Sequence, residues 1–263
     1  MQATTWHKSP SSESLAALVK AGRVVLRLPE DRALLASHGI IDLDPLLRQG
    51  FLERMDVRGL FRIRQVPRRV RSDQLAVASA LVSHNSYYIS WWTALSHHRL
   101  TEQLPRTIWV ATTVYRPTTS VQGTVFRFVR LADRKFFGFQ PLAVPGGHVL
   151  MASKSKAVID SLERPEYAGG LGEVGKAIAS PRVTVPSLIQ AARRQEVQAT
   201  TQRLGWFIEN IRKEDASPLL ALCDRDRRTI PIDRRGGHWW AVDTRWNVGV
   251  NFDAASLDAQ LQT

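Results

Sequence analysis

Cysteine is almost absent from this sequence, which has only Cys223 among 263 residues. One cysteine permits no internal disulfide and, without a second cysteine or a patterned histidine partner, it provides no thiolate metal site. No apolar run approaches the roughly 20 residues that span a bilayer, and the N-terminus lacks the charged and then apolar layout of a signal peptide. We therefore expect a cytoplasmic chain with no membrane segment, in which Cys223 is a small core residue.

Signatures of common enzymes are also missing. There is no GxSxG elbow, no GxxxxGK[ST] loop and no GxGxxG after an expected strand. His97 and His98 are adjacent, so on a helix they point about 100° apart and cannot easily share an ion. Asp224 and Asp226 form a DxD pair as in nucleotidyltransferases, but no Gly-Ser element precedes them at a suitable distance. The sequence predicts no catalytic residue, no metal site and no cofactor.

The first 72 residues carry a regular series of helix and strand signals. Ser11 and Ser12 are suited to cap a helix, Pro29 fits a first helical turn, and Asp44 before Pro45 is typical of a helix start. The expected elements are a helix over 13–20, a strand over 23–28, a helix from Pro29 to before Gly39, a short helix ending at Gly50, and strands over 51–55 and 60–64 around a turn. This order predicts a winged helix-turn-helix.

Charge is concentrated in the same segment. Residues 1–72 contain 13 Lys or Arg against 7 Asp or Glu, which is +6 of the chain's net +12. Basic surfaces bind phosphate backbones in a salt-dependent way, whatever the base sequence. A general preference of the genome for arginine is the alternative explanation of the basic composition, but it does not explain the clustering.

Six residues are the candidate DNA contacts. On the short helix, Arg48 and Gln49 have the groups that pair with guanine and adenine edges, although so short a helix could also leave them as solvated ends. The hairpin is expected to project arginines toward phosphates or the minor groove. These are Arg54, Arg58 and Arg62, together with Arg64, for which plain linker charge is the alternative.

A domain boundary is expected at Val66–Ser72, where a proline and a run of arginines follow the hairpin. The predicted domains are 1–72 and 73–263, giving an α+β chain with a larger mixed α/β C-terminal domain. In that domain, Lys156 and Asp160 are four residues apart on one expected helix, so we interpret them as an intrahelical ion pair, or as residues packed against the next helix, rather than as catalytic groups. Its further helices are expected at 73–82, 91–98, 154–162, 171–179 and 185–211, and its strands at 107–113, 125–131, 149–152 and within 219–252.

The larger domain resembles the AbiEi-type antitoxins of bacterial abortive-infection toxin–antitoxin systems. The resemblance rests on the order and spacing of short fragments over about 140 residues, each of them common by itself. The fragments are Tyr88–Ser90 with Thr93–Leu95, His98–Leu100 with Leu104 and Pro105, Ile108–Thr112, Ser155–Leu162, Pro165, Gly169 and Gly170 with Glu173 and Val174, and Arg203–Glu209.

This resemblance implies two activities. Such proteins repress their own operon by binding double-stranded operator DNA with inverted repeats through the N-terminal module. Their larger domain is needed to counter a cognate nucleotidyltransferase toxin, and the resemblance leaves open whether it binds that toxin directly. The chain departs from the family where the recognition helix is expected, because Asp42 and Asp44 would repel phosphates there. The alternatives are a stand-alone regulator whose larger domain senses a ligand or mediates oligomerisation, and an enzyme of unrecognised type.

Overall fold

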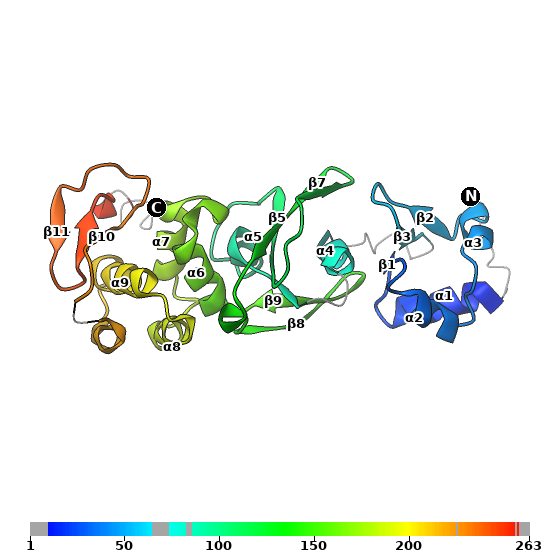
Figure 1. Cartoon of the computed structure of the whole chain (residues 1–263), viewed down its shortest axis with the longest axis horizontal. Helices are drawn as coiled ribbons and strands as arrows, with labels where there is room; N and C mark the ends of the chain where they lie inside the picture. Colours follow the sequence, from blue (N-terminus) through cyan, green and yellow to red (C-terminus); the bar gives the residue numbers. More distant parts are fainter. Residues whose placement is uncertain (1–9, 65–73, 83–85, 225, 256, 258–263) are drawn as a thin grey trace. The chain divides into compact units, whose positions relative to one another are not determined.

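The structure is a computed structural model that describes residues 10–64, 74–82, 86–224, 226–255 and 257 (Figure 1). The expected linker at Val66–Ser72 and Asp73, the first residue of the helix expected at 73–82, lie outside these residues. Helices and several sheets make the chain an α+β protein, as predicted. No described helix is both long and apolar enough to cross a membrane.

Contacts divide the chain into two compact units. Unit 1 comprises residues 1–88, 106–130 and 141–150, and unit 2 comprises residues 89–105, 131–140 and 151–263. The chain passes between them several times, so neither unit corresponds to one uninterrupted stretch of sequence. We describe each unit by itself.

Three helices and a small antiparallel sheet make up the N-terminal part of unit 1. Its strands have the order β1-β3-β2, with Val25 opposite Arg62 and Leu52 opposite Ile63. Apolar residues at helical spacing in α1, including Leu15 and Leu18, pack against this sheet in one hydrophobic core. The elements are α1 (Pro10–Lys20), β1 (Val25–Arg27), α2 (Arg32–Ser37), α3 (Asp44–Arg48), β2 (Leu52–Arg54) and β3 (Leu60–Ile63).

Two helix starts differ from the sequence prediction because nearby carboxylates bind other groups. The second helix begins at Arg32, since the Asp31 carboxylate accepts from the Arg27 backbone N–H at 2.7 Å and pairs with Arg23 at 2.9 Å. Asp44 is the first residue of α3 and not its cap, while the Asp42 carboxylate accepts from its N–H at 2.9 Å. In both places an aspartate side chain accepts a hydrogen bond from a backbone N–H near the start of the helix.

The largest sheet has six strands in the order β6-β7-β5-β4-β9-β8. Within it β5 and β7 run parallel, with Thr107 opposite Val125 and Thr112 opposite Arg130. The strands expected at 107–113, 125–131 and 149–152 are confirmed, but the edge strands β6 and β8 were missed. Pro141 lies inside β8, and proline is tolerated in a strand chiefly at a sheet edge. The bounds are β4 (Tyr87–Ile89), β5 (Thr107–Thr112), β6 (Thr119–Val121), β7 (Thr124–Arg130), β8 (Phe139–Val144) and β9 (Gly147–Ala152), with α4 (Gln74–Val82) packing on β5.

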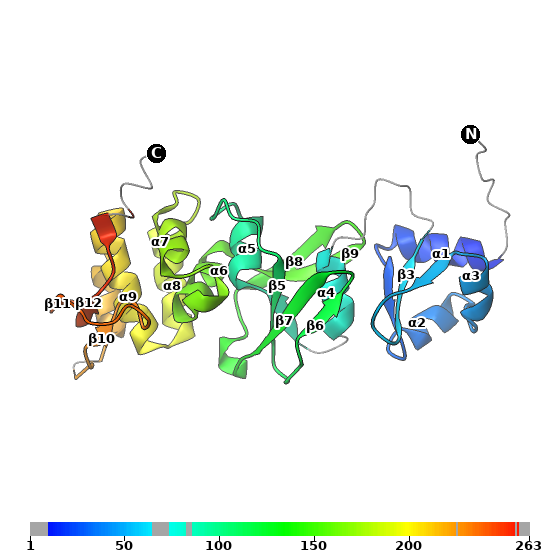
Figure 2. The same ribbon diagram turned by 90° about the horizontal axis from the view of Figure 1, so that it is seen from above.

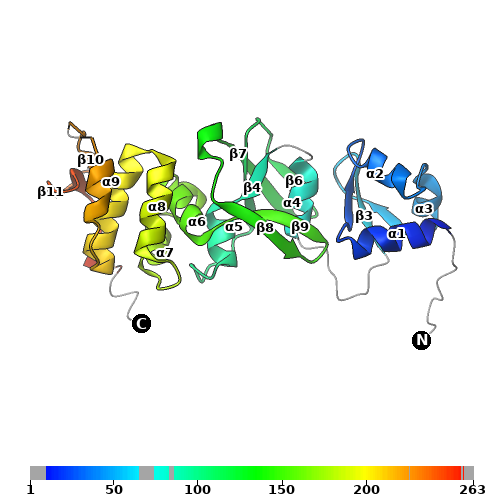
Figure 3. The ribbon, with the colours of Figure 1, turned by 90° about the horizontal axis from the view of Figure 1, so that it is seen from below.

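Unit 2 is built around α6, which contacts α5, α7, α8 and α9. Figure 2 and Figure 3 show α6, α7, α8 and α9 side by side. All residues of α6 from Lys156 to Leu162 are buried, so this helix has almost no solvent face. The expected helices are confirmed as α5 (Trp91–His97), α6 (Lys154–Glu163), α7 (Leu171–Ala179), α8 (Val185–Gln195) and α9 (Gln198–Phe207), which continues as the π-helix η3 (Ile208–Arg212). Short 3-10 helices are η1 (Asp133–Lys135) and η2 (Pro165–Tyr167).

The C-terminal segment contains less strand than its alternating pattern predicts. Residues from Leu219 begin in a 3-10 helix, because Pro218 favours a helical first turn, and Trp239 and Trp240 lie outside the strands. Cys223 is half-buried and not a core residue, which corrects the prediction. The elements are η4 (Ser217–Leu222), β10 (Ile230–Pro231), β11 (Ala241–Asp243) and β12 (Val248–Val250), with sheet order β10-β12-β11.

Candidate functional site

The six candidate DNA contacts all lie on α3 and on the hairpin of β2 and β3. Arg48 and Gln49 are exposed at the end of α3, and Arg58 is exposed in the hairpin turn. Arg54 and Arg64 are exposed beside the strands, whereas Arg62 is half-buried. The fold thus places on one small module all the residues that the sequence singled out.

Acidic or amide groups contact three of the four hairpin arginines. The Arg54 guanidinium lies 3.8 Å from the Asp44 carboxylate of α3, and Arg64 lies 3.4 Å from Glu53. Arg62 donates to the Gln122 side chain of the β6–β7 turn, within unit 1. Exposed pairs of this kind contribute about 0–1 kcal/mol, so they compete only weakly with a phosphate.

The contact of Gln122 with the hairpin was not predicted from the sequence. The Gln122 backbone N–H donates to the Asp56 carboxylate at 2.7 Å, and its side chain accepts from Arg62, so it contacts both the hairpin turn and β3. It has a positive φ of 48°, and it is followed by Gly123 in the turn. Because Gln122 lies far along the chain, only the tertiary structure brings it to the hairpin.

Arg48 and Arg58 form no ion pair with any residue that the structure describes. Both side chains are exposed and both belong to the α3–hairpin surface. A guanidinium is charged at any physiological pH and offers donors suited to phosphate or to a guanine edge. These two residues are therefore the most available cations of the predicted set.

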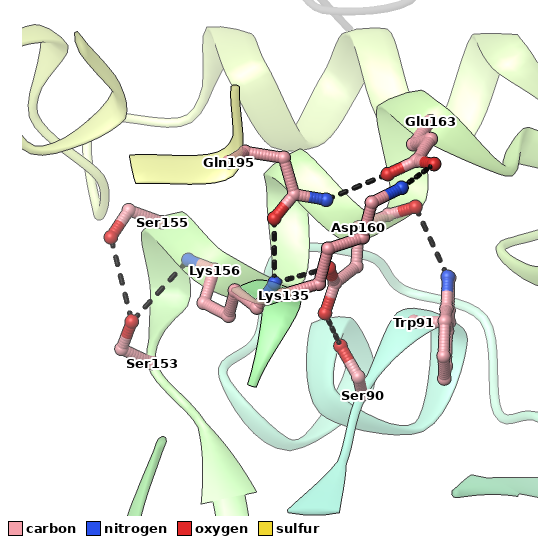
Figure 4. A network of polar contacts seen from close by, with 9 residues as sticks. All are labelled: Ser90, Trp91, Lys135, Ser153, Ser155, Lys156, Asp160, Glu163 and Gln195. Carbon is pink, nitrogen blue, oxygen red and sulfur yellow. Dashed lines mark hydrogen bonds and ion pairs between the residues drawn. The ribbon is translucent and has the colours of Figure 1, made fainter. Parts of the chain in front are cut away.

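The second notable site is a buried polar network in unit 2 (Figure 4). The Lys156 ammonium is fully buried and donates to Asp160 at 2.7 Å and to Gln195 at 2.8 Å, which confirms the predicted ion pair within α6. The other carboxylate oxygen of Asp160 accepts from Ser90 at 2.7 Å. Lys156 also lies 4.1 Å from the centre of the Phe137 ring.

The network continues from Lys156 toward the end of α6. Gln195 donates from its amide nitrogen to Glu163 at 2.6 Å, and Glu163 is paired with Lys135. Each charged group of the network is thus matched by an opposite charge or a hydrogen-bonding amide. A network satisfied in this way holds elements together, here α5, α6 and α8, and leaves no uncompensated base or nucleophile in it. We assign it a structural role.

The adjacent histidines do not share a metal-binding geometry. His98 is half-buried and its Nε2 lies 2.6 Å from the Ala152 carbonyl oxygen, while His97 is exposed. Burial lowers the pKa of His98, and the nearby charges of His97 and Lys154 lower it further, against the effect of the Ala152 carbonyl. In the described part of the chain, no group of three or more His, Cys, Asp or Glu side chains is placed to hold a metal ion.

His98 is expected to make stability depend on pH. Its folded pKa lies below the ordinary 6.5, so the unfolded chain binds the proton more readily. The resulting stabilisation is present above about pH 6.5 and is lost as the pH falls through the folded pKa. The free energy of unfolding, measured with urea at about pH 7.5 and 5.5, should differ less between the two pH values in His98→Gln than in the wild type. His97→Gln is the control. An unchanged difference in His98→Gln would refute this assignment.

Two pairs of adjacent tryptophans, Trp91 with Trp92 and Trp239 with Trp240, differ in exposure. Trp91 is buried in α5 and donates to the Asp160 carbonyl at 3.0 Å, and Trp92 is half-buried. Trp239 and Trp240 are both exposed, by 43% and 66%. The first pair therefore places one ring in the core, whereas both rings of the second pair face solvent.

Comparison with known proteins identifies a shared fold. No family model and no curated protein matches this chain. Among solved structures, the chain is similar to the RV2827C protein from Mycobacterium tuberculosis, with 13% sequence identity and a TM-score of 0.63. The match covers 97% of this chain and 96% of the other. At so low an identity the likeness extends over nearly the whole chain but concerns its fold alone.

Proposed function

We propose that this chain is an antitoxin and transcriptional autorepressor whose N-terminal module is a winged helix-turn-helix. The observation that carries the proposal is the element order α1-β1-α2-α3-β2-β3 with the sheet order β1-β3-β2. In a winged helix-turn-helix, the helix preceding the hairpin enters the major groove and the hairpin is the wing. Here α3 would be the recognition helix, and the turn that contains Arg58 would be the tip of the wing.

Surface charge supports DNA as the ligand of this module. Arg48 and Arg58 are exposed and free of ion pairs among the described residues, and they lie on the proposed recognition helix and wing. Arg48 and Gln49 would read base edges, and the wing arginines would contact phosphates. Asp42 and Asp44 reduce the positive potential of this surface, so affinity is expected to depend strongly on the arginines.

The antitoxin part of the proposal rests on the resemblance in the larger domain. Most of its fragments lie in the helical unit, where Ser155–Leu162 belongs to α6 and Arg203–Phe207 to α9. These two helices contact each other, so the fragments that carry the resemblance belong to one packed body. Such a body can expose a surface that acts on a toxin or its substrate independently of the DNA-binding module.

Fluorescence anisotropy with a labelled duplex from the chain's own promoter tests DNA binding. We expect affinity to fall linearly with salt concentration on logarithmic axes, because phosphate contacts release counterions. Arg48→Ala or Gln49→Ala should bring the affinities for the promoter and a scrambled duplex closer together. Equal affinity of the wild type for both duplexes, or no binding at low salt, would contradict specific repression.

Asp44→Asn is expected to strengthen DNA binding. The substitution removes a carboxylate that lies 3.8 Å from Arg54 and faces the same surface as the proposed phosphate contacts. Since exposed charge pairs contribute about 0–1 kcal/mol, a gain of up to about fivefold in affinity is expected at low salt. Asp133→Asn, an exposed aspartate in η1, is the matched control. Weaker promoter binding by Asp44→Asn would mean that Asp44 itself contacts DNA.

A stand-alone regulator with a ligand-sensing domain is the second candidate. It is favoured by a pocket of about 330 Å³ in unit 2, which lies in the size range of small-molecule sites. A stand-alone regulator would bind its promoter but would not protect cells from the toxin. A growth assay with the cognate toxin therefore separates the two candidates.

A further inference from the structure

The pocket in unit 2 lies at the N-terminus of α7, and we call it the α7 pocket. It has a volume of about 330 Å³ and is bordered by Gly170 and Leu171 at the start of α7, by Arg203 of α9, and by Arg234 and Arg235 after β10. These residues come from three distant parts of the sequence, so only the folded unit creates the pocket. Gly170 and Arg203 also belong to the fragments singled out in the sequence, yet DNA binding gives them no role.

Arg203 is the unusual side chain of the α7 pocket, because it is a cation that is only 3% exposed. Its Nε donates to the carbonyl oxygens of Pro231 and Ile232, each at 3.0 Å. Its Nη1 and Nη2 have no hydrogen-bond partner among the described residues, and no described carboxylate forms an ion pair with it. A buried guanidinium normally has such a partner, so the Arg203 donors are available to an anion.

The neighbouring charges increase the positive potential at Arg203. Burial and, to a lesser extent, the charge of Arg234 lower the pKa of Arg203 to about 10, against the smaller opposing effect of Asp233. Arg203 nevertheless remains charged at neutral pH. The positive charges of Arg203 and Arg234 repel each other, and a bound anion would reduce that repulsion.

The start of α7 adds neutral donors on the same side. α7 has nine residues, and no side chain caps its N-terminus. Gly170 has a φ of 100°, and a Cβ there would meet nothing within 4 Å, so the space before the helix is open. The first-turn acid Glu173 does not fill it, because its carboxylate accepts from Thr101 and Lys176. The unpaired N–H groups of a helix start favour an anion.

Two acidic residues also border the α7 pocket, and both have other partners. Asp233 accepts from the Arg235 backbone N–H at 2.8 Å, and Glu166 lies 3.7 Å from the Arg164 guanidinium. Both arginines of the β10 loop, Arg234 and Arg235, are exposed and are free to move toward a ligand. The arginine side chains that border the pocket therefore provide more hydrogen-bond donors than its two carboxylates can occupy.

We propose that the α7 pocket binds a phosphate group, held by Arg203, Arg234 and the first-turn N–H groups of α7. Guanidinium groups pair with phosphate through two parallel hydrogen bonds, which suits a buried arginine whose terminal nitrogens are free. The phosphate would belong to a free nucleotide or to an RNA backbone, since both present the same group. This site is separate from the proposed DNA surface and does not depend on it.

Isothermal titration calorimetry on the full-length chain tests the site. The titrants are inorganic phosphate, a nucleoside triphosphate and a short single-stranded RNA, and Arg54→Ala/Arg58→Ala/Arg62→Ala is the background, so that the proposed wing does not contribute. We expect at least one titrant to bind, and Arg234→Gln/Arg235→Gln to weaken its binding at least tenfold. Arg182→Gln/Arg193→Gln removes the same charge from exposed positions elsewhere in unit 2 and should leave binding unchanged.

The outcomes decide both the site and the source of the phosphate. Tighter binding of the triphosphate than of RNA identifies a free nucleotide, and the reverse identifies a nucleic-acid backbone. Arg203→Gln should abolish binding if it folds, and the exposed double variant tests the site even if it does not. Binding of no titrant, or equal loss in the double variant and its charge-matched control, would overturn the proposal.

Discussion

Lys156→Met is expected to lower the free energy of unfolding by about 3–5 kcal/mol, because it would leave the Asp160 carboxylate buried without its cation. Asp160 is only 2% exposed, and its side chain also accepts a hydrogen bond from Ser90 at 2.7 Å. Gln195 would also lose the ammonium that it contacts at 2.8 Å. Urea denaturation followed by circular dichroism measures the change.

Two further variants separate loss of the charge pair from loss of packing. Lys154→Met changes an exposed lysine in the same helix and should shift the unfolding free energy by less than about 0.5 kcal/mol. Lys156→Met/Asp160→Leu removes both charges, and it should be clearly more stable than Lys156→Met, since apolar residues often replace a buried pair at little cost. A loss under about 1 kcal/mol in Lys156→Met would show that the network is not structural.

The triple variant Arg54→Ala/Arg58→Ala/Arg62→Ala is expected to lose most of its affinity for promoter DNA. Each lost phosphate contact should reduce the slope of log affinity against log salt by about 0.9, giving a reduction of about 1 to 3 for the three arginines. The lower value applies if, in the DNA complex, Arg62 remains hydrogen-bonded to Gln122 and Arg54 remains paired with Asp44, so that neither contacts a phosphate. Anisotropy across a salt series provides both quantities.

The matched control replaces three exposed arginines of unit 2, Arg134, Arg182 and Arg193, by alanine. It changes the net charge by the same amount as the triple variant but leaves the hairpin intact. We expect nearly wild-type affinity and slope. If the control lowers affinity as much as the hairpin variant does, net charge rather than the wing accounts for binding.

The sequence was sufficient for most helices and for the hairpin. Local signals located α6, α7 and the strands β2 and β3, since amphipathic spacing, caps and turn residues all act within a few positions of the chain. The i,i+4 spacing also predicted the Lys156–Asp160 pair, which the structure confirms. The strand β8 was missed because Pro141 reads as a strand breaker unless the strand is known to lie at an edge.

Long-range contacts could not be read from the sequence. Gln122 contacts Asp56 and Arg62 across about sixty positions, and nothing in its local pattern predicts this. The α7 pocket likewise depends on Arg203 and Gly170 being brought together by helix packing. The assignment of Arg48, Gln49, Arg54, Arg58, Arg62 and Arg64 to DNA stays a prediction, supported by their common location on the α3–hairpin surface.

Growth of cells that express the cognate nucleotidyltransferase toxin tests the central claim most directly. The full-length chain and its Arg54→Ala/Arg58→Ala/Arg62→Ala variant are each co-expressed with the toxin from a promoter that neither controls. Because protection is assigned to the larger domain and not to the wing, both proteins are predicted to restore growth equally. Failure of the full-length chain to restore growth, although it is present in soluble form, would contradict an antitoxin function. Rescue by the wild type alone would show that protection requires the DNA-binding surface.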